Sequence, residues 1–264
     1  MKRKAYAKVN LFLNVKESRE DGFHNLEMVN IMINLADDLN FELTDGEIKV
    51  VVYAKNELNG KNNLAYKVAD YLKKAYRVKE GVKITITKRI PVGGGLAGGS
   101  SDAACTLSAL NELWNLGLSN EKLFEISKRF GSDTPYCFYQ APAIVKGVGD
   151  DIEALDIDIS DFNISLFNKG INVSTGTVFK NLKETNKYSL EEAVKNLQSK
   201  DYSVFIKGLK NDLQDTVFDL YPEVKKQYES LKRLYGEEGL FMTGSGSTII
   251  KISRKDENTH NQQK

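Results

Sequence analysis

Apolar and polar residues alternate through much of the first third of the chain, with the two-residue period of β-strands that bury one face. The segments with this period, or rich in β-branched and aromatic residues, are Ala5–Val15, Leu26–Leu35, Leu39–Leu43 and Ile48–Tyr53. Asp21-Gly22 and Asp45-Gly46 are turn dipeptides between them. We therefore expect the chain to begin with strands joined as β-hairpins.

A helical period replaces this alternation at Asn63–Tyr76. The apolar residues on one face of that helix are Leu64, Val68, Tyr71, Leu72 and Ala75. The pattern returns to a strand at Val82–Ile90, and a glycine-rich segment follows. Beyond it the sequence predicts helices at about Ser100–Leu116 and Glu121–Phe130, a short helix opened by Gly131–Phe138, and a strand at Ala143–Gly147.

Acidic residues around Leu155–Ser160 mark the expected boundary between two domains. The second domain is predicted to contain strands at Asn163–Phe167, Leu240–Thr243 and Thr248–Ile252, and helices near Leu190–Gln198, Tyr202–Leu209 and Tyr221–Tyr235. Strands come first, and helices and strands are then interspersed, which favours an α+β protein over a doubly wound sheet. The predicted domains are 1–157 and 158–253, followed by a polar tail, 254–264, that is expected to be disordered.

Composition narrows the classes of function. The 264 residues are 41% hydrophobic and 28% charged, as is usual for a globular protein. Because 37 basic residues face 36 acidic ones, the basic excess expected of a protein that binds a nucleic-acid polymer is absent. Two histidines and two isolated cysteines exclude a zinc-type site. With no signal peptide and no membrane-length apolar run, we expect a cytoplasmic monomer or weak homodimer that binds no membrane.

The glycine-rich segment Pro91–Ala104 is the strongest indication of chemistry. Five glycines within seven residues let backbone N–H groups turn inward around an anion, and a following helix adds its free N–H groups and dipole. Ser100-Ser101-Asp102 is expected to cap that helix, and the Ser101 hydroxyl to reach a phosphate-bound Mg²⁺. The residues predicted to form this phosphate site are Pro91, Val92, Gly93, Gly94, Gly95, Leu96, Ala97, Gly98, Gly99, Ser100 and Ser101. A flexible strand-to-helix loop is the alternative.

Several nucleotide-binding templates fail on this segment. A Walker A loop needs a Lys-Ser/Thr pair after its glycines, and none follows. Gly93-x-Gly95-x-x-Gly98 matches the dinucleotide fingerprint, but the stretch that should hold a second strand and an acidic residue, Leu113–Lys122, is a junction of two helices. The companion motifs of protein kinases are absent as well.

The chain instead resembles the GHMP kinase superfamily in three motifs that occur in the expected order. They are Ala7-Lys8-Val9-Asn10-Leu11, the Pro-x₃-Gly-Leu segment that begins at Pro91, and Gly244-Ser245-Gly246-Ser247. The segments that narrow the resemblance to members acting on a cytidine diphosphate-linked alcohol are AKVNLFLNV, Asp21-Gly22-Phe23-His24, GGGLAGGSSDAA, GSDTP and Asn211-Asp212-Leu213. The resemblance covers residues 4 to 252. It implies a ribosomal protein S5 domain 2-like N-terminal domain and a ferredoxin-like C-terminal domain.

The resemblance also assigns two catalytic residues. Asp133, in Gly131-Ser132-Asp133-Thr134-Pro135, matches the family's catalytic base, although an aspartate before proline at a helix start is also an ordinary cap. Lys8 matches the lysine that pairs with this base and offsets charge on the transferred phosphoryl group. On residue pattern alone, a lone lysine on a strand of alternating character, such as Lys8, is usually a solvated residue of the strand face.

Further residues are assigned to binding by the same resemblance. Phe23 and His24 match a cytidine pocket, with Phe179 as the opposite side of an aromatic sandwich and Asn10 as another substrate contact. Lys88 and Asn63 match positions that line the adenine side of the ATP site. The alternatives are core aromatic residues for the phenylalanines and plain surface polarity for Lys88 and Asn63.

The implied function is ATP- and Mg²⁺-dependent phosphorylation of the 2-hydroxyl of a methylerythritol carried on cytidine diphosphate, in the non-mevalonate route to isoprenoid precursors. A GHMP kinase for mevalonate, homoserine or a sugar is the alternative among enzymes. A catalytically silent nucleotide-binding protein is the alternative from another class.

Overall fold

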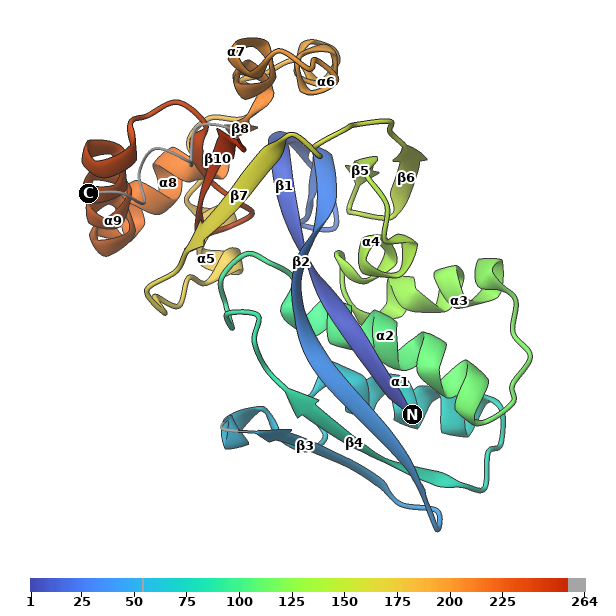
Figure 1. Ribbon diagram of the computed structural model, residues 1–264. Coiled ribbons are helices and arrows are strands. Elements are labelled where there is room, and N and C mark those ends of the chain that lie inside the picture. Colours follow the sequence, from blue (N-terminus) through green and yellow to red (C-terminus); the bar gives the residue numbers. More distant parts are fainter. Residues whose placement is uncertain (54, 256–264) are drawn as a thin grey trace. The chain divides into compact units, whose positions relative to one another are not determined.

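The computed structural model describes residues 1–53 and 55–255, so most of the predicted polar tail lies outside the described residues. The chain forms two compact units (Figure 1). Unit 1 consists of Met1–Lys8, Met32–Val92 and Ala97–Gln140. Unit 2 consists of Val9–Ile31, Gly93–Leu96 and the chain from Ala141 onward. Because both units are discontinuous, they do not correspond to the predicted limits 1–157 and 158–253, which stay a prediction.

Two long strands contribute to both units. They are β1, Lys2–Ser18, and β2, His24–Thr44, joined at the predicted Asp21-Gly22 turn. The sequence predicted two strands where β2 is continuous, because Asp37 and Asp38 interrupt its apolar run. The predicted break between these two strands was therefore wrong. The Asp37 carboxylate accepts the backbone N–H groups of Arg89 and Ile90, so its charge is satisfied inside the sheet.

The strand order in unit 1 also differs from the prediction. Strand β4, Gly81–Thr87, pairs antiparallel with the second half of β2 and parallel with β3, Ile48–Tyr53. Since β4 lies between β2 and β3, Asp45-Gly46 makes a turn but does not form the predicted hairpin. The Asp45-Gly46 dipeptide correctly predicted a turn of the chain. It could not show that β2 and β3 both pair with β4, which lies further along the sequence.

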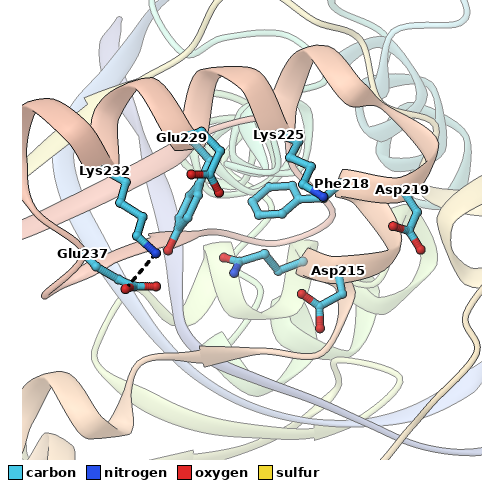
Figure 2. Close-up of a pocket in the computed structure, with 9 residues that line it drawn as sticks. Asp215, Phe218, Asp219, Lys225, Glu229, Lys232 and Glu237 are labelled. Carbon is cyan, nitrogen blue, oxygen red and sulfur yellow. Dashed lines mark ion pairs between the residues drawn. The ribbon is translucent and has the colours of Figure 1, made fainter.

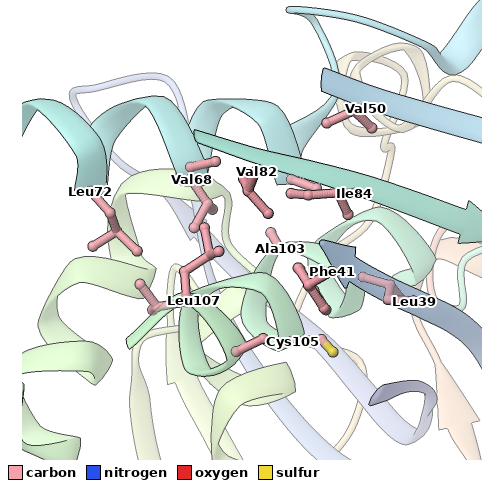
Figure 3. Packing of buried hydrophobic residues seen from close by; sticks show 14 of the residues in the cluster. Leu39, Phe41, Val50, Val68, Leu72, Val82, Ile84, Ala103, Cys105 and Leu107 are labelled. Atoms are coloured by element: carbon pink, nitrogen blue, oxygen red, sulfur yellow. The ribbon is translucent and has the colours of Figure 1, made fainter. Parts of the chain in front are cut away.

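Four helices complete unit 1: α1, Leu64–Ala75; α2, Gly98–Leu113; α3, Asn120–Ser127; and α4, Thr134–Tyr139. Short 3₁₀ turns lie at Asn56–Leu58 and Lys128–Phe130. Figure 3 shows how Val68 and Leu72 of α1 pack with Ala103 and Leu107 of α2 beneath the sheet. These four residues are fully buried, and removing them from water is the main force that fixes α2 against the sheet.

Unit 2 contains further strands. Strand β5, Ala143–Gly147, pairs antiparallel with the first half of β2 and with β6, Asp151–Ala154, which the sequence did not predict. The two-residue strand β8, Lys210–Asn211, pairs parallel with β1. A second, antiparallel sheet has the order β7-β10-β9, with bounds Phe162–Phe167, Ile249–Arg254 and Leu240–Met242.

The helices of unit 2 are α5, Thr175–Lys180; α6, Leu190–Leu197; α7, Tyr202–Phe205; α8, Leu213–Leu220; and α9, Pro222–Tyr235, with a 3₁₀ turn at Ile206–Gly208. Helices α5 and α8 are missing from the prediction. Helix α5 has only 6 residues, whereas Leu213, Val217 and Leu220 of α8 do have helical spacing, which the prediction overlooked. None of the helices in the described residues has both the length and the apolar character needed to cross a membrane.

Candidate active site

The glycine-rich segment forms a loop that leads directly into α2. Gly93, Gly95 and Ala97 have positive φ angles of 67°, 76° and 55°, so the backbone turns repeatedly in the left-handed region. Helix α2 begins at Gly98, with Ala97 at its N-cap position. The predicted cap at Ser100-Ser101-Asp102 is therefore wrong, because these residues lie inside the first turns. The first N–H groups of α2 have no acceptor within the helix and are available to an anion.

Two contacts hold the start of α2 against the other predicted catalytic segments. The Ser101 hydroxyl donates to the Tyr6 carbonyl of β1 at 2.6 Å, two residues before Lys8. A Cβ atom on Gly131 would lie 3.9 Å from Ser100 Oγ, so the Gly131–Pro135 motif passes close to the same helix end. Unit 1 thus brings the helix start, Lys8 and Asp133 into one region.

Lys8 and Asp133 form an ion pair. The distance from Lys8 Nζ to Asp133 Oδ1 is 3.2 Å, with the lysine side chain 4% exposed and the aspartate 36% exposed. Asp133 occupies the N-cap position of α4, yet its side chain makes no capping hydrogen bond. The two structural alternatives, a solvated lysine and a helix-capping aspartate, are therefore wrong. Lys8 is buried, and the Asp133 carboxylate pairs with the lysine and does not cap the helix.

The protein contact predicted for Mg²⁺ is the Ser101 hydroxyl. No group of three or more His, Cys, Asp or Glu side chains that could hold a metal occurs in residues 1–53 and 55–255. Mg²⁺ commonly keeps several waters and binds through one or two carboxylates together with substrate phosphates. Ser101 is a poor ligand, contrary to the prediction, because it is 1% exposed and its hydroxyl is bonded to Tyr6.

In unit 2 the third motif packs directly on the tip of the glycine-rich loop. A Cβ atom on Gly95 would lie 2.6 Å from the Thr243 carbonyl and 2.9 Å from that of Gly246. The Thr248 N–H donates to the Gly94 carbonyl at 3.3 Å. The second glycine-rich loop therefore supports the first through backbone contact, which leaves no room for a side chain at Gly95.

Asn211, in the predicted Asn-Asp-Leu segment, fixes this second loop. Its Nδ2 donates to the carbonyls of Met242 and Gly244 at 2.7 and 2.9 Å. Its Oδ1 accepts the Leu213 N–H at 2.9 Å. All three of these bonds are buried, so Asn211 determines where the loop between β9 and β10 lies. The sequence supplied this segment only as a family signature, without its role.

Asn10 is buried in unit 2, where its side-chain amide is already engaged. Its Nδ2 donates to Asn30 Oδ1 at 2.6 Å, and its backbone N–H donates to Thr243 Oγ1 at 2.9 Å. The residue is 2% exposed. Asn10 thus connects β1 to β2 and to the third motif. A contact between Asn10 and the substrate stays a prediction.

The predicted cytidine pocket brings two of its three rings together. The His24 and Phe179 rings stack with centroids 5.5 Å apart, and His24 Nδ1 lies 3.3 Å from the Lys16 carbonyl. A base cannot enter between two rings that are already in stacking contact. Phe23 is 59% exposed and therefore has no core role. A cytosine ring stacked on Phe179 must therefore have Phe23 on its other side, or the rings of His24 and Phe179 must first separate.

The two residues assigned to the adenine side both have other contacts. Asn63 caps α1: its Oδ1 accepts the Ala65 N–H, and its Nδ2 donates to the Leu58 carbonyl, each at 2.9 Å. Its adenine contact stays a prediction. Lys88 is not the surface residue of the alternative, because its ammonium lies between Asp37 and Asp102 with the side chain 8% exposed. Its ammonium is engaged by the two carboxyl groups. Its place on the adenine side stays a prediction.

A cavity of about 390 Å³ lies between α8 and α9 and shares no residue with the predicted site (Figure 2). Carboxylates outnumber ammonium groups along it, with Asp215, Asp219, Glu229 and Glu237 facing Lys225 and Lys232. Lys232 is paired with Glu237 at 2.8 Å. This balance of charge disfavours a polyphosphate, so the cavity does not compete with the glycine-rich loop as the nucleotide site.

Comparison with known proteins agrees with this geometry. The sequence models of the GHMP kinases N-terminal domain and the GHMP kinases C-terminal domain match residues 63–141 and 193–261. The chain is 40% identical over 260 residues to the 4-diphosphocytidyl-2-C-methyl-D-erythritol kinase of Bacillus cytotoxicus, which covers 97% of this chain and 89% of that one. It is 42% identical over 256 residues to the enzyme of the same name from Shouchella clausii, covering 96% and 86%.

A solved structure is similar as well. The crystal structure of a 4-(cytidine 5'-diphospho)-2C-methyl-D-erythritol kinase has a TM-score of 0.77 and 31% sequence identity, covering 96% of this chain and 90% of that one. The match of both family domains, together with near full-length relatives at this identity, is decisive. This chain belongs to the GHMP kinase family.

Proposed function

We propose that this protein transfers the γ-phosphoryl group of ATP to the 2-hydroxyl of 4-diphosphocytidyl-2-C-methyl-D-erythritol, in the non-mevalonate route to isoprenoid precursors. Membership of a kinase family implies ATP as the donor. The names of near full-length relatives at 40–42% identity support this acceptor. The single observation that carries the chemistry is the ion pair of Lys8 and Asp133 beside the start of α2.

Asp133 is the proposed base. Its carboxylate accepts the proton of the substrate hydroxyl as the hydroxyl oxygen forms its bond to the γ-phosphorus and the bond from that phosphorus to the β–γ bridging oxygen breaks. The products are the phosphate monoester and ADP. The Asp133 side chain is 36% exposed, although its partner Lys8 is buried. It is therefore accessible to a substrate hydroxyl, as a base must be.

Lys8 acts on charge and orientation. Its ammonium holds one oxygen of Asp133 and leaves the other for the hydroxyl proton. It also places a fixed positive charge where negative charge develops on the transferred group. Because the lysine side chain is 4% exposed, little water screens this charge.

The glycine-rich loop and the first N–H groups of α2 bind the phosphates by backbone donation. Mg²⁺, when bound, would supply positive charge that offsets the negative charge of the ATP phosphates. On the acceptor side, Phe23 and Phe179 are proposed to stack on cytosine, and His24 to bond to its edge.

A substrate panel tests this function against its alternatives. ADP release is measured with 4-diphosphocytidyl-2-C-methyl-D-erythritol, mevalonate, homoserine and galactose side by side, with ATP and Mg²⁺. We expect turnover only with the first compound. Turnover with another acceptor would replace the substrate assignment, and ATP binding without ADP release from any of them would favour a silent nucleotide-binding protein.

A further inference from the structure

A buried cluster of three charged side chains lies at the base of the glycine-rich loop, apart from the Lys8–Asp133 pair. Lys88 Nζ donates to Asp37 Oδ2 and to Asp102 Oδ2, the latter at 2.9 Å. The side chains of Lys88, Asp37 and Asp102 are 8%, 0% and 5% exposed. Burying three charges is costly unless each is paired and hydrogen-bonded, so their arrangement requires an explanation.

The two carboxyl groups lie at the two ends of the loop, and the lysine joins them. Asp37 Oδ1 accepts the N–H groups of Arg89 and Ile90 at 2.5 and 2.8 Å, which fixes the chain just before Pro91. Asp102 lies in the early part of α2, just after the phosphate-binding residues. Lys88 joins these two carboxylates, so it connects the chain that enters the loop to the helix that leaves it.

The same region is closely packed. A Cβ atom on Gly98, the first residue of α2, would lie 2.9 Å from Ile90 Cγ2 and 3.1 Å from Lys88 Nζ. The start of the helix therefore rests directly on the segment that precedes the loop. This contact is tight enough that a change in the cluster must move the N–H groups at the helix start.

The cluster holds two acidic groups and one basic group. One ammonium faces two carboxyl groups, and Asp102 Oδ1 is buried without a hydrogen-bond partner among the described residues. Replacing buried ion pairs by apolar side chains is often neutral or stabilising, so stability alone does not account for this arrangement. A fixed geometry at a binding loop does account for it.

We propose that Lys88, Asp37 and Asp102 are positioning residues that close the base of the glycine-rich loop and set the helix start at the spacing that ATP phosphates require. The proposal rests on the proposed use of ATP. The cluster acts through the loop backbone. Weakening it therefore lowers affinity for ATP more than it slows phosphoryl transfer.

Asp102→Ala is the informative variant. Lys88→Met leaves two buried carboxyl groups without their cation, which is itself strongly destabilising, whereas Asp102→Ala leaves one ammonium paired with one carboxylate. Asp102→Asn keeps the volume and an acceptor for Lys88 and is the conservative rescue. Lys74→Met, which removes an exposed ion pair with Asp70 on α1, is the matched control for losing an ion pair elsewhere in unit 1.

Three quantities are measured for each variant: KM and kcat, the Kd of ATP by calorimetry, and amide hydrogen exchange over residues 91–104 of the free protein. We expect Asp102→Ala to raise KM and Kd for ATP about 10-fold, as loss of a charge-assisted hydrogen bond implies, with kcat changed much less. Exchange over 91–104 should accelerate. Asp102→Asn should restore all three, and Lys74→Met should leave them unchanged.

Unchanged ATP affinity and exchange in Asp102→Ala, or a lower melting temperature with neither change, would overturn the proposal. The outcome is separable from that of the proposed function. If the wild type does not phosphorylate the CDP-linked alcohol but Asp102→Ala still loses ATP affinity and loop protection, the function fails and the positioning role stands. If the wild type is active and Asp102→Ala binds ATP normally, the proposed function stands and the positioning role fails.

Discussion

Lys8 and Asp133 meet at 3.2 Å although one belongs to the first strand and the other to the start of α4. The lysine is buried and the aspartate partly exposed, so the pair presents its carboxylate outward. The carboxylate makes no cap for its own helix. This relationship gives the proposed reaction a proton acceptor and a fixed positive charge in one place.

Removing either member of this pair should abolish turnover and leave ATP binding nearly intact. Asp133→Asn removes the proton acceptor, and Lys8→Met removes the charge that holds it. General acid–base groups contribute about 10²–10⁴-fold, so kcat should fall by at least that range. Single-turnover kinetics and the Kd of ATP measure the two effects separately.

Lys4→Met is the control for the lysine variant, because Lys4 is an exposed residue of β1 paired with Asp38. It should retain wild-type turnover. A rate like that of the wild type in Asp133→Asn or Lys8→Met would remove that residue from the mechanism.

Much of the fold follows from local sequence. The strand at Ile48–Tyr53 and the returning strand at Ala143–Gly147 have the observed bounds. Helix α1 begins after the predicted Asn63, which caps it. These elements are predictable because periodicity, turn dipeptides and helix caps are properties of a few neighbouring residues.

What depends on distant partners was not predictable. The charges at Asp37 and Asp38 made one strand look like two, because the N–H groups that satisfy Asp37 come from Arg89 and Ile90. Lys88 was assigned to ATP or to the surface, because no local pattern shows that both of its partners are buried with it. The proposed catalytic pair was predicted from family resemblance and not from residue pattern.

Gly95→Ala should weaken ATP binding at least tenfold. The new methyl group would meet the carbonyls of Thr243 and Gly246, and a left-handed backbone costs a non-glycine residue about 1–2 kcal/mol. The loop and the third motif must therefore separate. Gly176→Ala is the control, because its Cβ would meet nothing within 4 Å and its φ is not in the left-handed region. Calorimetry with ATP and a thermal melt decide, and normal ATP affinity in Gly95→Ala would contradict the docking of the two loops.

Asp102→Asn should change how stability depends on pH. Burial, opposed by Lys88, raises the pKa of Asp102 from 3.8 to about 7. A raised pKa means that the folded state holds this proton more tightly than the unfolded state. Its stabilising contribution is thus complete below the unfolded pKa and is lost as pH rises through about 7. Asparagine does not titrate.

The stability of the wild type relative to Asp102→Asn should therefore fall as pH rises from 4 to 8. Melting temperatures of both proteins across this range measure the difference. A wild type that becomes relatively more stable with rising pH would show that the carboxyl is ionised at a normal pKa or stabilised in its charged form.

Asn211→Ala should destabilise the protein and raise the KM for ATP. It leaves the carbonyls of Met242 and Gly244 and the Leu213 N–H without their partner, at a cost of about 1–3 kcal/mol for each buried group. Asn181→Ala, which removes an exposed side-chain bond to the Thr177 carbonyl, is the control. Equal melting temperatures for the two variants would show that Asn211 does not fix the second loop.

Phe23→Ala should raise the KM for the CDP-linked alcohol without lowering stability. Base–aromatic stacking is worth about 1–3 kcal/mol, so an increase on the order of 10-fold is expected, with the KM for ATP unchanged. Because Phe23 is 59% exposed, its removal opens no core cavity. Leu43→Ala, at another exposed apolar residue that is 54% exposed, should change neither quantity. An unchanged KM for the alcohol in Phe23→Ala would exclude this ring from the cytidine pocket.

The most direct test of the whole account is the identity of the product. Purified protein is incubated with ATP, Mg²⁺ and 4-diphosphocytidyl-2-C-methyl-D-erythritol, and the mixture is followed by phosphorus NMR and mass spectrometry. We predict one new phosphate monoester on the 2-hydroxyl for each ADP released, and none with Asp133→Asn. ADP formed without that monoester, or a phosphate on another hydroxyl, would contradict the account.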